Sequence, residues 1–320
     1  MQTLQIKDSS IHDKNMKTID SIIKEFSDSF NIITTGFRQI DTQKRGWHSG
    51  ELCIIGGRPR MGKTAFILSV IKNLLKEDFP IALFTATDTI HIQFLSRIVS
   101  CLSNKRPTIV VAENLKLLKE NPLDNLPLYL HCKQNMNLAY IRSNAEILVH
   151  KYNVKCIFIE TIQSIFHAEE IDNPSINKEL ICIELKKIAQ ELHVPFILTS
   201  DLSETLEQRK GLKGKQPKIT DLVYADSITN IADSIFLLFN PTYYKRRICR
   251  PMEEDEPLDT FYVNIAQNKY DSTGIVSLTF NPNNGLVEDE TNYTISPSDA
   301  KNLQTFMDNF DLIYEGDSPF

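Results

Sequence analysis

Short apolar runs alternate with longer amphipathic segments along the middle of the chain. Each run is three to five residues long, and nearly every position in it is hydrophobic. A strand that is buried on both faces has this continuous pattern, whereas a strand with one wet face alternates. The runs are Ile81–Phe84, Leu128–Leu130, Cys156–Ile159, Phe196–Thr199 and Ile235–Phe239.

The segments between these runs have apolar residues at helical spacing. The clearest are residues 89–103, 138–152 and 176–192. Continuous apolar strands separated by helices indicate a mostly parallel sheet that is covered by helices on both faces. The pattern therefore predicts an α/β fold for the middle of the chain.

The pattern changes toward the end of this region. Phe261–Asn268 and Ile275–Phe280 have the composition of strands, and the turn residues 271–274 between them predict a β-hairpin. The stretch before the hairpin, residues 241–259, is polar and charged and contains prolines. We expect an exposed loop there.

The two ends of the chain have patterns of their own. After a polar arm of about fifteen residues, apolar residues recur with helical spacing at Met16, Ile19, Ile22, Ile23, Phe26 and Phe30. A helix with such a stripe must bury it, either on its own domain or on a neighbouring molecule. Near the other end Phe306, Phe310 and Tyr314 recur every four residues between acids, which favours a terminal amphipathic helix lying on the domain.

Composition excludes some classes of protein. The chain has 320 residues, 42% of them hydrophobic, which is enough for one large α/β domain with appendages. No apolar run approaches the roughly 18–20 residues that span a bilayer, and the N-terminus lacks the apolar stretch of a signal peptide. The six cysteines are scattered without a CxxC pair and several lie in apolar runs, so we expect buried thiols in a reduced, cytoplasmic protein.

The net charge of −6 is unevenly distributed. Residues 286–320 contain eight acids and one base, which leaves the rest of the chain at about +1. A body this close to neutral neither favours nor excludes a local channel for DNA.

One motif predicts specific chemistry. It matches G-x-x-x-x-G-K-[ST] and consists of Gly57, Arg58, Pro59, Arg60, Met61, Gly62, Lys63 and Thr64. An apolar run, 52–55, precedes it and a helical segment, 65–71, follows it, which is the required strand–loop–helix context and argues against a chance match.

Each part of this phosphate loop has a physical role. The glycines let backbone N–H groups surround a polyphosphate as an anion nest. The Lys63 side chain brings a positive charge near the β- and γ-phosphates, and the Thr64 hydroxyl can bind the Mg²⁺ that bridges them. The motif therefore predicts binding of ATP with Mg²⁺.

Several segments together resemble the RecA-like ATPase domain of DnaB-type replicative DNA helicases. They are Thr35–Asp41, Gly46–Leu52, the phosphate loop, Glu160–Gln163, Leu185–Ser200 and the hairpin around Lys269. The resemblance covers residues 33–285 and implies a RecA-like P-loop ATPase fold, with a mostly parallel sheet, flanking helices and a C-terminal β-hairpin. Before it we expect no counterpart of the family's primase-interacting domain, only a helix in the place of the linker that docks on the adjacent subunit of a hexameric ring.

The resemblance also implies roles for single residues. Glu160 stands where the family's Walker B strand ends in Asp, so we expect it to contact Mg²⁺; the alternative is a solvated acid at a strand end. Asp88 follows Thr87, which falls on the position of the catalytic glutamate, and Asp88 either orients water or caps the following helix. Lys269 stands at the trans-acting finger of the ring, where it would reach the neighbour's site; the alternative is an exposed strand lysine.

Other positions depart from the family. Thr87 replaces the catalytic glutamate, Asp201 a phosphate-sensing glutamine, and Gln267 the lysine of the finger. In the loop that contacts DNA in the family, Val223 and Asp226 stand in place of a basic residue and a glycine. These changes predict slow hydrolysis, because general-base assistance typically contributes about 10²–10⁴-fold, and weakened binding of single-stranded DNA.

The last four residues, Asp317–Phe320, look like the acidic, Pro-Phe-terminated tip of bacterial single-stranded-DNA-binding proteins. Those tips insert a terminal Phe and its carboxylate into basic pockets on replication and repair proteins. The tail is therefore expected to recruit such a partner or to mimic that tip, with a chance match of four residues as the alternative.

The patterns divide the chain into a polar arm and linker-like helix at 1–32, a RecA-like ATPase domain at 33–285 and an acidic tail at 286–320. The first hypothesis is an ATP-dependent DNA helicase domain that forms a homo-oligomeric ring and moves along single-stranded DNA in replication. The second is a catalytically weakened ATP-binding scaffold or regulator of replication proteins. The third, a recombination or clock-type RecA-like ATPase, is disfavoured by residues 58–61 inside the loop.

Overall fold

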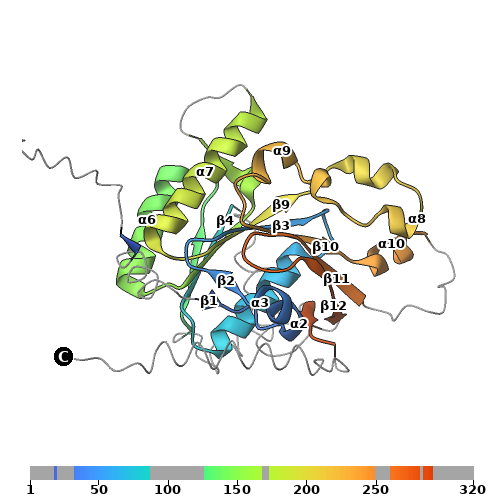
Figure 1. Cartoon of the computed structure of the whole chain (residues 1–320), viewed down its shortest axis with the longest axis horizontal. Coiled ribbons are helices and arrows are strands. Elements are labelled where there is room, and N and C mark those ends of the chain that lie inside the picture. Colours follow the sequence, from blue (N-terminus) through green and yellow to red (C-terminus); the bar gives the residue numbers. More distant parts are fainter. Residues whose placement is uncertain are drawn as a thin grey trace, which may run out of the picture.

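A nine-stranded sheet runs through the residues described by the computed structural model, which are 18–19, 32–86, 126–167, 173–248, 260–281 and 284–290 (Figure 1). Its strands are β3 (Leu52–Gly57), β4 (Ile81–Thr85), β5 (Leu128–Cys132), β7 (Cys156–Glu160), β9 (Phe196–Asp201), β10 (Ser234–Phe239), β11 (Thr260–Asn268), β12 (Gly274–Asn281) and β13 (Leu286–Glu288). Their order is β13-β12-β11-β10-β3-β9-β7-β4-β5.

Six neighbouring strands of this sheet are parallel, from β10 through β3, β9, β7 and β4 to β5. The other three, β11, β12 and β13, are antiparallel. Every apolar run identified in the sequence lies in one of the parallel strands, and β11 and β12 form the predicted hairpin. The predicted α/β fold with a mostly parallel sheet is therefore confirmed.

Helices cover both faces of the sheet (Figure 1). They are α2 (Arg38–Lys44), α3 (Lys63–Lys76), α6 (Leu138–Tyr152), α7 (Pro174–Leu192), α8 (Gly211–Gly214), α9 (Ala225–Ile228) and α10 (Pro241–Ile248). Apolar side chains of α2 and α3 pack in a core on one face, and those of α6, α7 and α9 pack in a core on the other. Short turns of 3-10 helix are η3 (Ile162–Ser164), η4 (Glu204–Gln208) and η5 (Ile219–Asp221), and two-residue strands are β1 (Ile32–Ile33), β2 (Trp47–His48), β6 (Met136–Asn137) and β8 (Ile165–Phe166).

The predicted helices inside the described residues are present. α6 has the predicted bounds, and α7 begins two residues before its predicted start. The side chain of Asn173 caps α7 by accepting a hydrogen bond from Ser175 N at 2.9 Å, and Pro174 occupies the first turn, where its missing N–H costs nothing. The predicted helix at 89–103 lies outside the described residues, as do residues 20–30 of the linker-like helix and the aromatic repeat of the tail.

The expectation of an exposed loop over 241–259 is wrong for its first part. Residues 241–248 form α10, and Tyr244 is 4% exposed because its ring packs against Phe239, with centroids 5.9 Å apart. The polar composition of 241–248 does not predict a helix, because the side chains that pack against it lie outside this segment. Residues 249–259 lie outside the described part of the chain.

The cysteines in the described residues are free thiols. Cys53, Cys156 and Cys182 are buried, as their apolar surroundings predict, and Cys132 is partly exposed. Burial raises the pKa of Cys53 and of Cys182 to about 12, so these thiols stay protonated and unreactive at neutral pH. Within the described residues, the helices lack the combination of length and apolar character that crossing a bilayer requires.

Candidate functional site

The phosphate loop connects β3 to α3 at the carboxyl edge of the parallel strands, the edge where ligands bind in open α/β sheets. Two of its residues have left-handed backbone angles, Arg60 with φ 67° and Gly62 with φ 93°. A Cβ at Gly62 would also lie 2.8 Å from a carbon of the Phe261 ring, so both the backbone angle and the space favour glycine. The loop can therefore turn tightly into α3, which begins at Lys63.

Met61 anchors the loop to the protein interior. Its side chain is 1% exposed and packs in the core, and its N–H donates to the Arg58 carbonyl at 3.1 Å. Pro59 and Arg60 are exposed on the outer side of the turn. This anchor fixes the loop at the N-terminus of α3, where backbone N–H groups and the helix dipole favour an anion.

The ammonium group of Lys63 has two partners inside the site. It donates to the Gly57 carbonyl at 2.6 Å and to Asp201 Oδ1 at 2.7 Å. Gly57 and Asp201 are opposite each other in the pairing of β3 with β9, so the sheet itself places both groups beside the lysine. The positive charge of the loop is thus held at the carboxyl edge of the sheet.

Thr64 and Glu160 converge from different elements. Thr64 lies in the first turn of α3 and Glu160 ends β7, and the threonine hydroxyl donates to Glu160 Oε1 at 2.5 Å. A hydroxyl and a carboxylate oxygen are hard oxygen ligands of the kind that Mg²⁺ prefers. Mg²⁺ commonly takes only one or two such groups from the protein and completes its octahedron with water and phosphate oxygens.

This pair fits a nucleotide-bound Mg²⁺ better than an all-protein metal site. The described residues contain no group of three or more His, Cys, Asp or Glu side chains that could hold a metal ion. The pair Thr64 and Glu160 would leave most of the coordination sphere to the nucleotide and water. Its place next to Lys63 suits the metal that bridges the β- and γ-phosphates.

Arg58 of the loop is held by the segment that follows β9. Its Nη1 donates to the Leu202 carbonyl at 2.8 Å, and its Nε donates to Glu207 Oε1 at 3.4 Å. The same Glu207 oxygen accepts a hydrogen bond from the Tyr244 hydroxyl at 3.0 Å. These contacts tie the phosphate loop to η4 and α10.

The turn after Glu160 is held by a buried lysine. Lys178 of α7 is 9% exposed, and its ammonium donates to the carbonyls of Ile165, Ile162 and Gln163 at 2.7, 3.2 and 3.4 Å. Burial lowers the pKa of Lys178. The Gln163 side chain in this turn donates to Ser200 Oγ at 3.2 Å, so the ends of β7 and β9 are linked.

The loop at 223–228, which the resemblance aligns with the DNA-contacting loop of the family, is joined to the end of β9. Val223 N donates to the Asp201 carbonyl at 3.0 Å. Tyr224 has a left-handed backbone with φ 66° and is partly buried against the core, whereas Asp226 is exposed. The exposed side of this loop therefore carries a negative charge, which disfavours contact with a phosphate.

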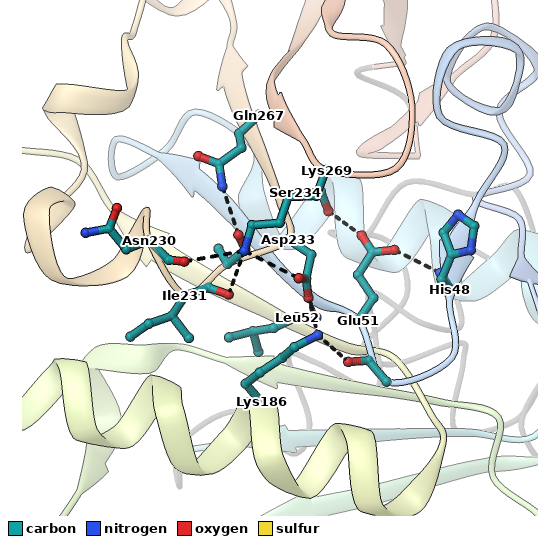
Figure 2. Close-up of polar contacts among 12 residues, drawn as sticks. His48, Glu51, Leu52, Lys186, Asn230, Ile231, Asp233, Ser234, Gln267 and Lys269 are labelled. Carbon is teal, nitrogen blue, oxygen red and sulfur yellow. Dashed lines mark hydrogen bonds and ion pairs between the residues drawn. The ribbon is translucent and has the colours of Figure 1, made fainter. Parts of the chain in front are cut away.

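The two finger positions on the hairpin contact a different part of the molecule (Figure 2). Lys269 Nζ lies 3.5 Å from Asp233 Oδ1 and 3.3 Å from the Asn230 carbonyl. Gln267 Nε2 donates to the carbonyls of Thr229 and Ala232 at 2.9 and 2.8 Å. Both side chains thus hold the segment between α9 and β10.

Asp233 is the centre of this second cluster (Figure 2). It is 4% exposed, and its Oδ2 accepts hydrogen bonds from Leu52 N at 2.8 Å and from Lys186 Nζ at 2.5 Å. Leu52 begins β3, and Lys186 lies on α7. The cluster therefore joins the starts of β3 and β10 to the hairpin and to α7.

The two clusters lie at opposite edges of the sheet. Ser234 pairs with Cys53 at the start of β3 and with Asn268 at the end of β11, which places Lys269 at the amino edge. The phosphate loop begins at the other end of β3, five residues beyond Leu52, which is roughly 17 Å in an extended strand. The structure thus brings together Lys63, Thr64 and Glu160 but not Lys269. Thr87 and Asp88 lie outside the described residues.

Four residues that hold the site were missed by the sequence analysis: Gln163 for its side-chain contact, Lys178, Glu207 and Tyr244. Their partners are 13 to 149 residues away along the chain, so a local sequence pattern does not predict these contacts. Lys178 alone had a signal, because it is the first position of the otherwise apolar buried stripe of α7.

Comparison with known proteins identifies the family to which this chain belongs. The family described as DnaB-like helicase C terminal domain matches residues 32–289. Replicative DNA helicase DnaC of Bacillus subtilis (strain 168) is 29% identical over 300 residues, which cover 88% of this chain and 63% of that protein. Replicative DNA helicase DnaB of Geobacillus stearothermophilus is 27% identical over 262 residues, which cover 78% of this chain and 54% of that protein.

Solved structures agree on the fold. A DnaB-like replicative helicase, described with its interactions with primase, superposes with a TM-score of 0.71 at 24% identity, covering 86% of this chain and 68% of that one. An ATPase domain superposes with a TM-score of 0.73 at 24% identity, covering 86% of this chain and all of that one. The chain spans roughly half to two-thirds of the length of the curated relatives.

Proposed function

The chain belongs to the DnaB-like helicase C-terminal domain family, and on that premise we propose that it is an ATP-dependent helicase domain that moves along DNA in replication, in the cytoplasm. The observation that carries the proposal is the convergence of Lys63, Thr64 and Glu160 at the carboxyl edge of the sheet, beside a loop of backbone N–H donors. In P-loop ATPases a loop lysine, a Ser or Thr hydroxyl and a Walker B carboxylate hold the phosphates and the Mg²⁺.

Each residue of the site has a proposed role toward ATP. The amides of Gly57–Thr64 and the Lys63 ammonium bind the phosphates, and Thr64 and Glu160 provide oxygen ligands for Mg²⁺. When bound, Mg²⁺ would neutralise charge that develops on the transferred phosphoryl group. Asp88 is proposed to orient the attacking water.

We propose that the working form is a homo-oligomeric ring. Lys269 stands at the edge of the sheet opposite its own phosphate loop, so it can serve a nucleotide only on a neighbouring subunit. With 43% of its side chain exposed, it is accessible to such a neighbour. Single-stranded DNA would contact the loop at 223–228, with Asp226 weakening that contact.

Turnover of ATP by the pure protein tests the proposal. We expect hydrolysis that rises when single-stranded DNA is added and that is lost in Lys63→Ala. Lys72→Ala, which removes a lysine from the same helix about two and a half turns away, is the matched control and should keep turnover. A rate of ATP turnover that changes neither when DNA is added nor in Lys63→Ala would contradict the helicase function.

A second candidate function is a catalytically weakened ATP-binding scaffold or regulator of replication proteins. Two observations favour it: Asp201 is paired with the phosphate-loop lysine, and Gln267 is engaged by backbone carbonyls within its own chain. Nucleotide binding that is abolished by Lys63→Ala, without turnover in the presence of DNA, is the result that this candidate expects.

The arm and linker-like helix at 1–32, the ATPase domain at 33–285 and the acidic tail at 286–320 are proposed as the three parts of the chain. The first residues of the third part pair with the sheet as β13. For Asp317–Phe320 we propose contact with a replication or repair protein that binds single-strand-binding-protein tips. Deleting these four residues should abolish binding to such clients, and unchanged binding would rule the contact out.

A further inference from the structure

The ion pair between Lys63 and Asp201 puts a negative charge where a phosphate is expected to bind. The two charged atoms lie 2.7 Å apart, and the lysine side chain is only 13% exposed. The other partner of the ammonium is the Gly57 carbonyl, at 2.6 Å. Both acceptors contact the Lys63 ammonium, the group expected to bind a phosphate. A phosphate oxygen that approaches this ammonium therefore also approaches the Asp201 carboxylate.

The backbone fixes Asp201 in this place. It is the last residue of β9 and is opposite Gly57 in the parallel pairing with β3. Its carbonyl accepts a hydrogen bond from Val223 N at 3.0 Å, and the preceding residue, Ser200, is fully buried. Only rotation of the aspartate side chain can therefore move the carboxylate away from the lysine.

The residues after Asp201 are also held against the loop. The Leu202 carbonyl accepts from Arg58 Nη1 at 2.8 Å, and Glu207 accepts from both Arg58 and Tyr244. A movement of this segment away from the loop would break these contacts together. The backbone that carries the carboxylate is thus fixed beside the loop, although the Asp201 side chain itself is 40% exposed.

Resting on the proposed function, we propose that Asp201 is a specificity-determining residue that lowers the preference of the site for a nucleoside triphosphate over the diphosphate. A γ-phosphate that reaches Lys63 must either displace the carboxylate or share the ammonium with it, and two anions at one cation repel each other. The β-phosphate is held largely by loop amides, for which Asp201 does not compete. The carboxylate therefore weakens triphosphate binding more than diphosphate binding.

Equilibrium binding of two nucleotides to the full chain tests this inference. Dissociation constants are measured for ADP and for the non-hydrolysable ATP analogue AMP-PNP, both with Mg²⁺, in the wild type, Asp201→Asn and Asp201→Ala. The alanine change removes the charge without adding an amide donor. Glu77→Gln is the matched control, because Glu77 is an exposed acid just after the far end of α3, away from the phosphate loop.

Both Asp201 variants should bind AMP-PNP about tenfold more tightly and ADP within about twofold of the wild type, as expected for one partly screened charge contact. The Glu77 control should leave the ratio of the two constants unchanged. Equal gains for both nucleotides, or an unchanged ratio in both Asp201 variants, would overturn the inference while leaving nucleotide binding intact. Folded protein that binds neither nucleotide in any variant would instead overturn the proposed function, and the inference with it.

Discussion

Among the residues of this site, Glu160 has the most specific proposed role, because it must provide an anionic ligand for Mg²⁺. Its carboxylate is 2.5 Å from the Thr64 hydroxyl, and these two oxygens are the proposed protein ligands of Mg²⁺. A glutamate reaches one methylene further than an aspartate, and here that length is used to reach across from β7 to the first turn of α3. The charge and the length of this side chain are therefore separable by mutation.

Glu160→Gln should keep the hydrogen bond from Thr64 but lose the charge. We expect nucleotide binding to lose its dependence on Mg²⁺, and ATP turnover to fall by about 10²-fold, because the metal would lose an anionic ligand. Glu160→Asp keeps the charge with a shorter reach and should show a smaller loss. A Mg²⁺ titration of nucleotide affinity is the measurement, and an unaltered titration curve in Glu160→Gln would contradict the assignment.

A second single-residue prediction concerns pH. The Asp41 carboxyl accepts hydrogen bonds from Thr35 N and Gly36 N, at 2.8 and 2.9 Å, yet burial raises its pKa from 3.8 to about 6, and the charge of Asp289 adds to the rise. A carboxyl with a raised folded-state pKa binds its proton more tightly when folded. Its stabilising contribution is therefore complete below about pH 4 and is lost as the pH rises through about 6.

Asp41→Asn should remove this pH dependence. Between pH 4 and pH 7, the free energy of unfolding of the wild type should fall by on the order of 2 kcal/mol relative to the variant. Urea unfolding at several pH values measures the difference. Asp78→Asn, which removes an exposed carboxylate outside this cluster, is the matched control, and parallel pH profiles for wild type and Asp41→Asn would refute the prediction.

At the scale of elements, α7 fixes the turn that follows the Walker B strand. The Lys178 ammonium donates to three carbonyls of residues 162–165, so one side chain ties together the backbone of the whole turn. Because the Lys178 ammonium is buried, water could not fully replace its hydrogen bonds to these carbonyls if the lysine were lost.

Lys178→Met should cost about 1–3 kcal/mol of the free energy of unfolding, because the methionine keeps the packing but removes the hydrogen bonds that the ammonium donates to the three carbonyls. Amide hydrogen exchange should become faster at residues 161–166, including the Ser164 amide that donates to Thr161 at 2.9 Å. Lys187→Met, an exposed neighbour on the same helix, should change neither measurement. Loss of stability without local exchange would mean that the lysine acts through the core and not through the turn.

The elements differ in how well the sequence predicts them, for a physical reason. Five of the six parallel strands are buried on both faces, all but the edge strand β5, so each of the five has a continuous apolar run that can be recognised without knowing its neighbours. α10 was missed because its buried Tyr244 depends on Phe239 and on Glu207, neither of which alters the local polar composition.

In the candidate site, too, local features can be predicted from the sequence, whereas contacts between distant residues cannot. The phosphate loop is predictable because its chemistry is contained in eight consecutive residues. The pairing of Lys63 with Asp201 spans 138 residues and is decided by strand order and register, which spacing along the chain does not encode. The finger positions are a third case: the resemblance named Lys269, but the contacts of Gln267 with Thr229 and Ala232 depend on where the hairpin meets α9.

At the scale of the whole molecule, the sheet separates two groups that the proposed reaction needs together. Lys63 lies at its carboxyl edge and Lys269 at its amino edge. No motion of the lysine side chain spans the length of β3, roughly 17 Å. In the proposed assembly, one chain would offer its phosphate loop to one neighbour and its finger to another, a head-to-tail arrangement that can close into a ring.

Mixing two inactive variants tests whether the finger acts in trans. Lys63→Ala and Lys269→Ala should each abolish turnover when pure. In an equal mixture, an interface is complete when a Lys269→Ala subunit supplies the phosphate loop and a Lys63→Ala subunit supplies the finger, so random assembly should restore about a quarter of the wild-type turnover. The double variant Lys63→Ala/Lys269→Ala, mixed with either single variant, is the control, because no interface in it has both lysines. Recovery requires contact between subunits, whereas a mixture as inactive as its components would show that Lys269 does not complete a neighbour's site.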